Sequence, residues 1–550
     1  MGPTGRLPDS MTTARRLVLT LLVLAAGSAM LWAWGLGQPR AVGDPAVSRI
    51  GCLSYAAFRV PGESPLDPSQ TVSEVRLEAD LRFLASHTNC VRSYSVGQGM
   101  DALPRVAQRL GMQVLLGIWI GRDNRLNEKE IALGIATARA YPDTVRAVMV
   151  GNEVLLRGEQ PESALAAYIS RVRAEVAQPV TYADVWDFWL RHPRLAEAAS
   201  FVTVHILPFW EDSPVPIEHA VEHVLSIYDK VKARFPQHDV LIGETGWPNV
   251  GRNRHGAVPS RENAARFVRG VVSAAEHRGI RYNVVEAFDQ PWKRQLEGAV
   301  GGYWGIFASD GSAKFPLHGP VVEEPRWAWG IGCAVAVGLL FLLTGTRLGP
   351  RIGRAGGLFL FLTGIGAGLA LAAQARTIWL TCRSPFEYGV STCFAVMSLA
   401  ACWLLALSLS RWLSGGEAAR IPAAVRIGDG DTAERLLAVV RLVLLFGTAA
   451  TNLLLAFDPR YRDFPIEWLI VPALGFALLA IVGPSKSRED DAREEWLLAL
   501  VIVTMLPAIM AIERLANLHA LAWVALCALL ALSVGLPWKG GATPRANQHQ

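Results

Sequence analysis

The sequence predicts two parts of different fold class: an α/β part forming a (β/α)8 TIM barrel outside the membrane, and an all-α polytopic transmembrane region. The first observation is that residues 49–318 have balanced charge, with 30 Lys+Arg and 30 Asp+Glu, and contain no apolar run long enough to cross a bilayer. The second is hydropathy, because the chain after Pro325 is almost continuously apolar. At 550 residues the chain is also longer than one ordinary domain.

The N-terminal segment predicts a membrane anchor. Arg15 and Arg16 stand at the start of an apolar stretch that ends at residue 37 and has about the 20 residues that a membrane span requires. A cleaved signal peptide has a shorter apolar region followed by a small-residue cleavage site. We therefore expect residues 1–14 to be cytoplasmic and residues 15–37 to form an uncleaved signal anchor.

Short apolar runs predict a barrel at residues 48–318. Such continuous runs are typical of a parallel sheet buried under helices on both faces. The segments between them, such as 73–86 and 262–279, repeat apolar residues three and four apart, as helices do. Eight strand–helix units fit the usual barrel size of about 250 residues. The eight runs begin at Ile50, Asn89, Gln113, Val145, Pro179, Phe201, Val240 and Tyr282.

Seven further apolar segments predict a transmembrane region at 327–537, followed by a cytoplasmic tail at 538–550. The predicted spans are 327–346, 355–375, 388–413, 436–457, 465–483, 496–512 and 518–536. If the first arginines are cytoplasmic, the inner loops and tail hold Arg347, Arg351, Arg354, Arg411, Arg420, Arg426, Arg435, Lys486, Arg488, Arg493, Lys539 and Arg545. The outer loops hold only Arg376, Arg383, Arg460, Arg462 and Arg514. The positive-inside rule agrees with this orientation and places the barrel outside.

Two features of this region have alternative interpretations. Arg441 lies inside a span, and we expect it to snorkel to the cytoplasmic surface. The alternative is a functional charge within the membrane. The outer loop at 457–465, "FDPRYRDFP", is expected to be a solvated, salt-bridged turn, and its alternative is a surface that guides a glycan or docks the barrel.

Cysteine usage and charge exclude several classes of function. The seven cysteines include no CxxC pair and no zinc-ligand spacing, so we predict no metal and no cofactor. Cys52 and Cys90 are expected to be buried free thiols, with a disulfide as the alternative. A bridge between Cys382 and Cys393 is a further alternative. The neutral barrel argues against a nucleic-acid partner, which requires clustered basic charge.

Two glutamates stand where predicted strands end. Glu153 ends the fourth strand and Glu244 the seventh, and barrel active sites lie at the carboxyl ends of the strands. Cleavage of a glycosidic bond uses such a pair, one carboxyl protonating the leaving oxygen and the other, about 5–5.5 Å away in retaining enzymes, attacking the sugar. The two roles require different protonation states. Asn152 can hydrogen-bond the substrate 2-hydroxyl. The alternative is a structural ion pair at the strand ends.

The motifs "VGNEV" and "IGETGWP" resemble the two signatures of glycoside hydrolase family 17, which contains β-1,3-glucanases and β-1,3-glucanosyltransferases. The stretch "ETGWPNVG…ENAARF" continues the family pattern, and "VRSYSV" resembles its second strand. The resemblance spans residues 49–315 and implies that Glu153 is the general acid/base and Glu244 the nucleophile. The chain departs from the family at "HILPFW", residues 205–210, where plant members have an aromatic-rich Tyr-Pro stretch. The acceptor side of the cleft is therefore expected to differ.

Further residues are predicted to line or support the site. Arg92 and Tyr94 are expected to orient the nucleophile. His205 either lines the cleft or makes a structural hydrogen bond. Tryptophans near strand ends either stack on sugar rings or belong to the core. The remaining predicted substrate-binding residues are Trp119, Asp184, Trp210, Trp247, Glu286, Asp289, Trp292 and Lys293.

The architecture and the resemblance together predict a membrane-anchored, retaining β-glucan transglycosylase. Bacterial membrane-bound relatives look like enzymes that cut and rejoin β-1,3-glucan, and an enzyme that remodels a nascent polymer gains from fixation where that polymer emerges. We expect a multi-pass protein of a bacterial inner membrane with a periplasmic barrel. Its partners are β-1,3-glucan or β-glucan oligosaccharides and the lipid bilayer, with a membrane glucan synthase as a further candidate.

Other functions stay open at this point. The close alternative is an endo-β-1,3-glucanase, because water and a sugar hydroxyl compete for the same covalent intermediate and the sequence does not show which wins. The second alternative is a non-catalytic glucan-binding scaffold or transporter. A synthase that uses nucleotide sugars is disfavoured, since no predicted inner loop is long enough to fold into a nucleotide-binding domain.

Overall fold

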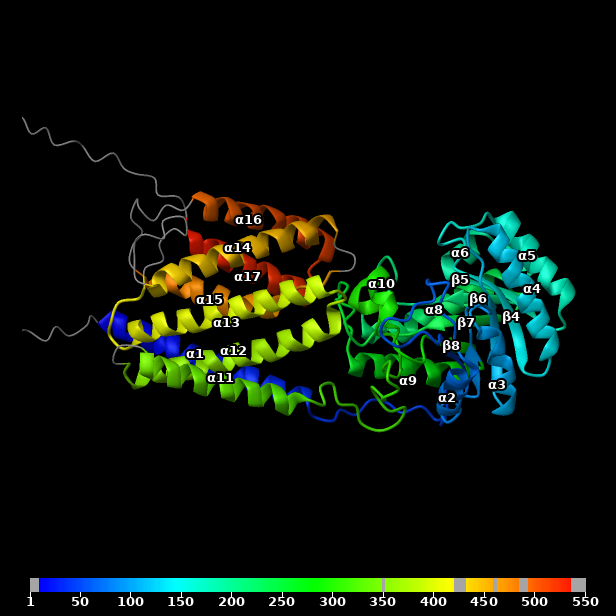
Figure 1. The fold of residues 1–550 in the computed structure, drawn as a ribbon, viewed down its shortest axis with the longest axis horizontal. Coiled ribbons are helices and arrows are strands. Elements are labelled where there is room, and N and C mark those ends of the chain that lie inside the picture. The colour runs from blue at the N-terminus through cyan, green and yellow to red at the C-terminus, as the bar shows by residue number, and fades with distance from the viewer. Residues whose placement is uncertain (1–8, 349–351, 420–431, 459–461, 484–492, 536–550) are drawn as a thin grey trace, which may run out of the picture. The chain divides into compact units, whose positions relative to one another are not determined.

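The computed structural model describes residues 9–348, 352–419, 432–458, 462–483 and 493–535 (Figure 1). The chain divides into two compact units, Pro39–Glu323 and the combination of Met1–Gln38 with Glu324–Gln550. Several predicted features lie outside the described residues. They are residues 1–8, the tail at 538–550, and the loop residues Arg351, Arg420, Arg426, Arg460, Lys486 and Arg488, with Lys539 and Arg545 of the tail.

The first unit is built on a closed barrel of parallel strands in the order β1 to β8, which confirms the predicted barrel. Each strand pairs with the next along the chain, and β1 pairs with β8 to close the ring. Seven of the eight apolar runs contain the corresponding strand, and the eighth, which begins at Tyr282, contains all of β8 except Arg281. The strands are β1 (Leu53–Ser54), β2 (Cys90–Arg92), β3 (Gln113–Ile118), β4 (Val145–Asn152), β5 (Val180–Val185), β6 (Val202–His205), β7 (Val240–Thr245) and β8 (Arg281–Val284).

Helices follow the strands and cover the outside of the barrel, as Figure 1 shows for α4 and α5. Local signals set their ends. The side chain of Ser73 accepts from the N–H of Arg76 at the start of α2, and Gly279, in the left-handed conformation, ends α9. The helices are α2 (Glu74–Leu84), α3 (Leu103–Arg109), α4 (Asn124–Ala140), α5 (Glu162–Glu175), α6 (Trp186–Arg191), α7 (Leu195–Ala198), α8 (Ile217–Arg234), α9 (Arg261–Arg278) and α10 (Arg294–Gly301), with 3₁₀ turns η1 (Met100–Ala102) and η2 (Pro291–Lys293).

Alternate residues of the strands face the barrel interior and the helices. Leu53, Val91 and Val114 pack into the large core beneath the helices. A separate cluster fills the interior, with members from five strands and two residues that immediately precede β1 and β6. The members are Cys52, Cys90, Leu115, Ala147, Met149, Ala183, Phe201 and Leu241. The polar residues at the carboxyl ends of the strands therefore lie next to an apolar layer inside the barrel.

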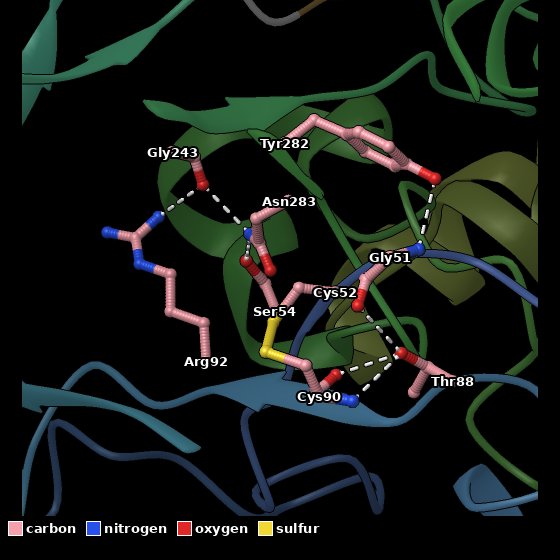
Figure 2. The surroundings of a disulfide bond; sticks show 9 residues. All are labelled: Gly51, Cys52, Ser54, Thr88, Cys90, Arg92, Gly243, Tyr282 and Asn283. Atoms are coloured by element: carbon pink, nitrogen blue, oxygen red, sulfur yellow. Dashed lines mark hydrogen bonds between the residues drawn. A yellow bond between two sulfur atoms is a disulfide. The ribbon is translucent and has the colours of Figure 1, made fainter. Parts of the chain in front are cut away.

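Cys52 and Cys90 form a disulfide within this apolar layer, so the expectation of two free thiols is wrong (Figure 2). The bond is possible because β1 and β2 are neighbours and bring the two Cα atoms to 4.5 Å. Strand pairing across 38 residues is not visible in the local sequence. Cys382 and Cys393 do not pair with each other.

The second unit consists of apolar helices, which run side by side in Figure 1. Each predicted span corresponds to one helix. In the described part of the chain, six are long and apolar enough to cross a membrane, while α15 and α17 are shorter apolar helices. The helices are α1 (Asp9–Leu36), α11 (Trp327–Leu348), α12 (Arg354–Thr381), α13 (Pro385–Leu413), α14 (Thr432–Phe457), α15 (Ile466–Val482), α16 (Arg493–Glu513) and α17 (Leu518–Val534).

Arg441 does not snorkel, which corrects the expectation from the sequence. The residue is only 4% exposed, and its guanidinium forms an ion pair with the fully buried Glu495 of α16. The two residues belong to different helices, so hydropathy along α14 alone cannot reveal the partner. In the described part of the outer loop, Arg462 pairs with Asp458 at 2.7 Å, as the salt-bridged interpretation expects.

Candidate active site

Glu153 stands on a sharp turn at the carboxyl end of β4. Gly151 has φ 87° and Glu153 itself has φ 52°, so the backbone turns out of the strand immediately after Asn152. A Cβ on Gly151 would lie 2.7 Å from Cγ2 of Val154, which explains the need for glycine. The turn leaves the Glu153 side chain 23% exposed at the mouth of the barrel.

Glu244 lies near the carboxyl end of β7, beside His205 of β6. The two residues are register partners in the parallel sheet. A Cβ on Gly243 would lie 2.4 Å from Cγ2 of Thr203 and 3.3 Å from Cδ2 of His205. Glycine at position 243 therefore allows β6 and β7 to approach closely enough for the His205 ring to reach Glu244.

The side chains of Glu153, His205 and Glu244 lie close together. One side-chain N or O atom from each residue lies within 4.8 Å of the other two. His205 joins the carboxylates, with Nδ1 2.9 Å from Oε1 of Glu153 and Nε2 3.7 Å from Oε1 of Glu244. One oxygen of each carboxyl group therefore lies within 4.8 Å of the other, which is below the spacing of about 6.5–9.5 Å that inverting glycosidases need to admit a water.

Arg92, on β2, forms hydrogen bonds with residues at the carboxyl ends of both β4 and β7. Its NH1 donates to Oε1 of Glu244 at 2.8 Å and to the carbonyl of Gly243 at 2.8 Å. Its NH2 donates to Oδ1 of Asn152 at 2.6 Å. Because the Asn152 oxygen accepts from Arg92, the amide NH2 is the group that can donate to a substrate hydroxyl.

The surroundings of Glu244 favour its ionised form. Burial opposes ionisation, but the charges of His205, Arg92 and Lys293 and a hydrogen bond from Tyr94 outweigh it. The pKa of Glu244 is therefore below the ordinary glutamate value. A carboxylate held ionised and hydrogen-bonded beside an anomeric carbon is suited to nucleophilic attack.

Four of the predicted substrate-binding residues are buried and contact other protein groups. The closed barrel and its loops leave these side chains no open surface. Their exposed fractions are 0% for Asp184, 1% for Trp247, 0% for Glu286 and 4% for Asp289.

Each buried group has an identified partner. Asp184 bonds the hydroxyl of Tyr182 and the N–H of Val185, and burial raises its pKa to about 6. Both oxygens of Glu286 are 3.0 Å from Nζ of Lys293, and burial raises the pKa of Glu286 to about 7 despite the opposing lysine charge.

Asp289 and Trp247 form hydrogen bonds with residues of neighbouring loops. Asp289 pairs with Lys314 and accepts from the N–H of Gly305 at 3.1 Å. Burial raises the pKa of Asp289 to about 6. The Trp247 ring packs among aromatic core residues, and its Nε1 donates to the carbonyl of Val258 at 3.0 Å.

Three of the predicted substrate-binding tryptophans retain accessible surface. Trp119 is 38% exposed, with the guanidinium of Arg157 4.4 Å from its ring centroid. Trp210 is half-buried and stacks with Trp304 at a centroid distance of 6.1 Å. Trp292 is half-buried and donates to Oε1 of Gln290 at 2.9 Å. These rings are the candidates for stacking on sugar.

Sequence reasoning missed a polar layer that supports the site from within the barrel. Asn283 of β8 donates to Oγ of Ser54 at 2.6 Å and to the carbonyl of Gly243 at 2.8 Å. Figure 2 shows that this carbonyl also accepts from Arg92, above the disulfide. A signal was present, because Cys52 and Ser54, like Cys90 and Arg92, are two residues apart and so share the inward face.

The cluster of Glu153, His205 and Glu244 has the donor atoms of a metal site. The Arg92 guanidinium opposes that use, because it donates to the Glu244 oxygen at 2.8 Å and would repel a divalent cation there. The arrangement instead combines one carboxylate held by Arg92, that of Glu244, with a second, partly exposed carboxyl group, that of Glu153.

Comparison with known proteins gives similarity over the barrel. Residues 54–305 match the family described as "BtgE/BtgC glycoside hydrolase domain". The chain is 28% identical over 263 residues to a Candida albicans protein named "Glucan 1,3-beta-glucosidase", covering 44% of this chain and 85% of that protein. It is 26% identical over 292 residues to a Saccharomyces cerevisiae protein of the same name, covering 49% and 93%.

A solved structure also aligns with the barrel. It is a glycoside hydrolase family 17 β-1,3-glucanosyltransferase from Rhizomucor miehei, 28% identical, with a TM-score of 0.43. The alignment covers 50% of this chain and 98% of that protein.

Proposed function

We propose that this chain is a membrane-anchored, retaining β-glucan transglycosylase that acts on β-1,3-glucan. The observation that supports it is the pair of carboxyl groups of Glu153 and Glu244, with oxygens within 4.8 Å of one another at the carboxyl ends of β4 and β7. The names of the Candida albicans and Saccharomyces cerevisiae relatives supply the substrate class, a glucan with 1,3-β linkages.

The proposed reaction has two steps. Glu153 protonates the glycosidic oxygen while Glu244 attacks the anomeric carbon, which releases one part of the glucan and leaves the other bound to Glu244. Glu153, now ionised, then takes the proton of an acceptor hydroxyl as that oxygen displaces Glu244. Arg92 holds Glu244 in place, and Asn152 donates to the 2-hydroxyl of the sugar whose bond is broken.

The acceptor decides between transfer and hydrolysis. Transfer requires a sugar to occupy the acceptor side and exclude water. The attachment of the barrel to a large apolar unit favours transfer, because fixation at a membrane suits remodelling of a polymer that emerges there. The glucosidase names of the relatives favour the alternative, an endo-β-1,3-glucanase.

The proposal places the barrel outside the cytoplasm of a multi-pass membrane protein. Eight apolar helices of the described chain match the predicted spans, and six have the length to cross. The disulfide between Cys52 and Cys90 supports an oxidising compartment for the barrel. The relatives named above are fungal and give no support to a bacterial inner membrane, so the compartment is proposed here only as extracytoplasmic.

Incubation of the detergent-solubilised full chain with laminari-oligosaccharides tests the proposal. Products longer than the donor support transfer, and only shorter products support the glucanase. The control is Glu128→Gln, which removes a half-exposed carboxyl that pairs with Arg171 outside the cleft. If the wild type gives no products and Glu244→Gln leaves cellular glucan unchanged, the non-catalytic scaffold replaces the proposal.

A further inference from the structure

The contact between His205 and Glu153 has a consequence for proton transfer. We propose that His205 is a positioning residue for the general acid. Its Nδ1–H donates a hydrogen bond to Oε1 of Glu153, so that the transferable proton resides on Oε2, the other carboxyl oxygen. The inference rests on the proposed role of Glu153 and deepens it, because it states which oxygen exchanges the proton with the glucan.

The distances assign the histidine tautomer. Nδ1 lies 2.9 Å from Oε1 of Glu153, within hydrogen-bonding range, whereas Nε2 lies 3.5 Å from NH1 of Arg92. A guanidinium has only donors, so a proton on Nε2 would face another donor. In its neutral form the ring therefore carries its proton on Nδ1, and in its charged form it keeps that proton, so Nδ1–H donates to Glu153 in both forms.

Glu244 does not offer Nε2 a competing acceptor. Its Oε1 is 3.7 Å from Nε2, beyond hydrogen-bonding distance, and already accepts from Arg92 at 2.8 Å. The same arginine that holds the nucleophile thus sets the tautomer of the histidine. The carboxyl groups of Glu153 and Glu244 are therefore linked through the ring of His205 and the guanidinium of Arg92.

Burial holds the ring in this orientation. The His205 side chain is fully buried, and the close approach at Gly243 packs the ring against β7. The ionisable groups that face it are Arg92 from β2, Glu153 after β4, Asp184 from β5 and Glu244 from β7. Asp184 accepts hydrogen bonds from the hydroxyl of Tyr182 and from the N–H groups of Val185 and Leu156.

The hydrogen bond serves both steps of the reaction. In the first, the proton leaves Oε2 for the leaving oxygen while Nδ1–H stays on Oε1. The resulting carboxylate is then stabilised by that same donor until Oε2 takes the acceptor proton. No proton passes through the imidazole, so the residue positions the acid without being itself a proton carrier.

Two amide variants test this role. The side-chain NH2 of asparagine can replace the Nδ1–H donor, whereas that of glutamine falls near the Nε2 position. We expect His205→Asn to keep kcat/KM for laminari-oligosaccharides within about tenfold of wild type and His205→Gln to lose about 10²-fold or more, the scale of general acid catalysis.

A second substrate separates positioning of the acid from a general defect. A dinitrophenyl β-laminaribioside has a leaving group that needs no protonation, so release of dinitrophenol should fall only a few-fold in His205→Gln. Equal losses of the two variants on both substrates, or an undiminished His205→Gln on the oligosaccharide, would overturn the inference. If His205→Gln does not fold, His205→Asn decides alone: retained oligosaccharide activity supports the inference and its loss overturns it.

Failure of the proposed function gives a different pattern. A wild-type protein inactive on both substrates, or a Glu153→Gln variant that keeps its oligosaccharide activity, removes the glycosidase assignment itself. An active wild type, an inactive Glu153→Gln and an undiminished His205→Gln remove only the positioning role.

Discussion

Arg92 and Glu244 are 152 positions apart in the chain, yet NH1 of the arginine donates to Oε1 of the glutamate at 2.8 Å. The contact joins β2 to β7, which are not neighbours in the barrel, and so crosses its interior. The NH2 group of the same guanidinium donates a hydrogen bond to Oδ1 of Asn152 at the end of β4. One buried cation thereby sets the positions of two strand ends that carry the proposed chemistry.

Replacement of Arg92 by lysine should impair catalysis although the charge is kept. A lysine ammonium cannot reproduce the planar fork that bonds Glu244 and Asn152 together. A displacement of about 1 Å at a reacting group costs about 10²-fold in rate, and we expect a kcat loss of that size on laminari-oligosaccharides. Arg171→Lys, at an exposed ion pair, is the matched control. Wild-type kcat in Arg92→Lys would contradict the positioning role.

Replacement of Glu244 by glutamine should remove the nucleophile with little change of shape. We expect a loss of kcat of about 10⁴-fold or more, in the range seen when a covalent nucleophile is removed. Product formation from laminari-oligosaccharides measures it, with Glu128→Gln expected to match the wild type. A residual activity within tenfold of wild type would exclude Glu244 as the nucleophile.

The disulfide should protect two of the seven cysteines from alkylation. In denatured, unreduced protein we expect a thiol reagent to label the other five and to reach Cys52 and Cys90 only after reduction. Peptide mass spectrometry identifies the labelled positions. Cys52→Ala with Cys90→Ala should destabilise the barrel by about 3–4 kcal/mol through loss of the closed loop. Labelling of Cys52 without reduction would contradict the bond.

Stability of the barrel should fall as pH rises from about 5 to 7. The pKa of Glu286 is raised from its ordinary 4.5 to about 7, so in this range the folded chain binds more protons at this site than the unfolded chain does. Under proton linkage, stability then decreases with pH, by about 3 kcal/mol for such a shift. The pKa values of Asp184 and Asp289, each raised to about 6, act in the same direction.

Thermal unfolding of the full chain across this pH range measures the effect. We expect Glu286→Gln to show a shallower decline than the wild type, because an amide does not titrate. Glu128→Gln should follow the wild-type curve. Parallel curves for Glu286→Gln and wild type would show that the Glu286 carboxyl does not bind the extra proton.

Removal of one partner of the ion pair between Arg441 and Glu495 should destabilise the protein more than replacement of both partners by apolar residues. Glu495→Gln leaves the arginine charge buried without this carboxylate, which costs about 3–5 kcal/mol for such pairs. The double variant Arg441→Met, Glu495→Leu should recover most of the loss, because it leaves no charge in the apolar interior. Thermal unfolding in detergent measures both. A double variant no more stable than Glu495→Gln would contradict this account.

The sequence by itself determined the division of the chain, the eight strands and the places of the two glutamates. Each of these depends on local pattern. An apolar run reports a strand buried on both faces, and a carboxylate at its end lies at the mouth of a barrel whatever the other strands contain.

Only the tertiary structure decided which distant groups meet. The bond between Cys52 and Cys90, the two contacts of His205, the pairing of Arg441 with Glu495 and the burial of Trp247 were missed, mis-assigned or left open. The physical reason is that each depends on register and distance between segments far apart in the chain. Those distances are set by how the whole barrel or helix bundle packs, whereas hydropathy along one segment specifies only which face is buried.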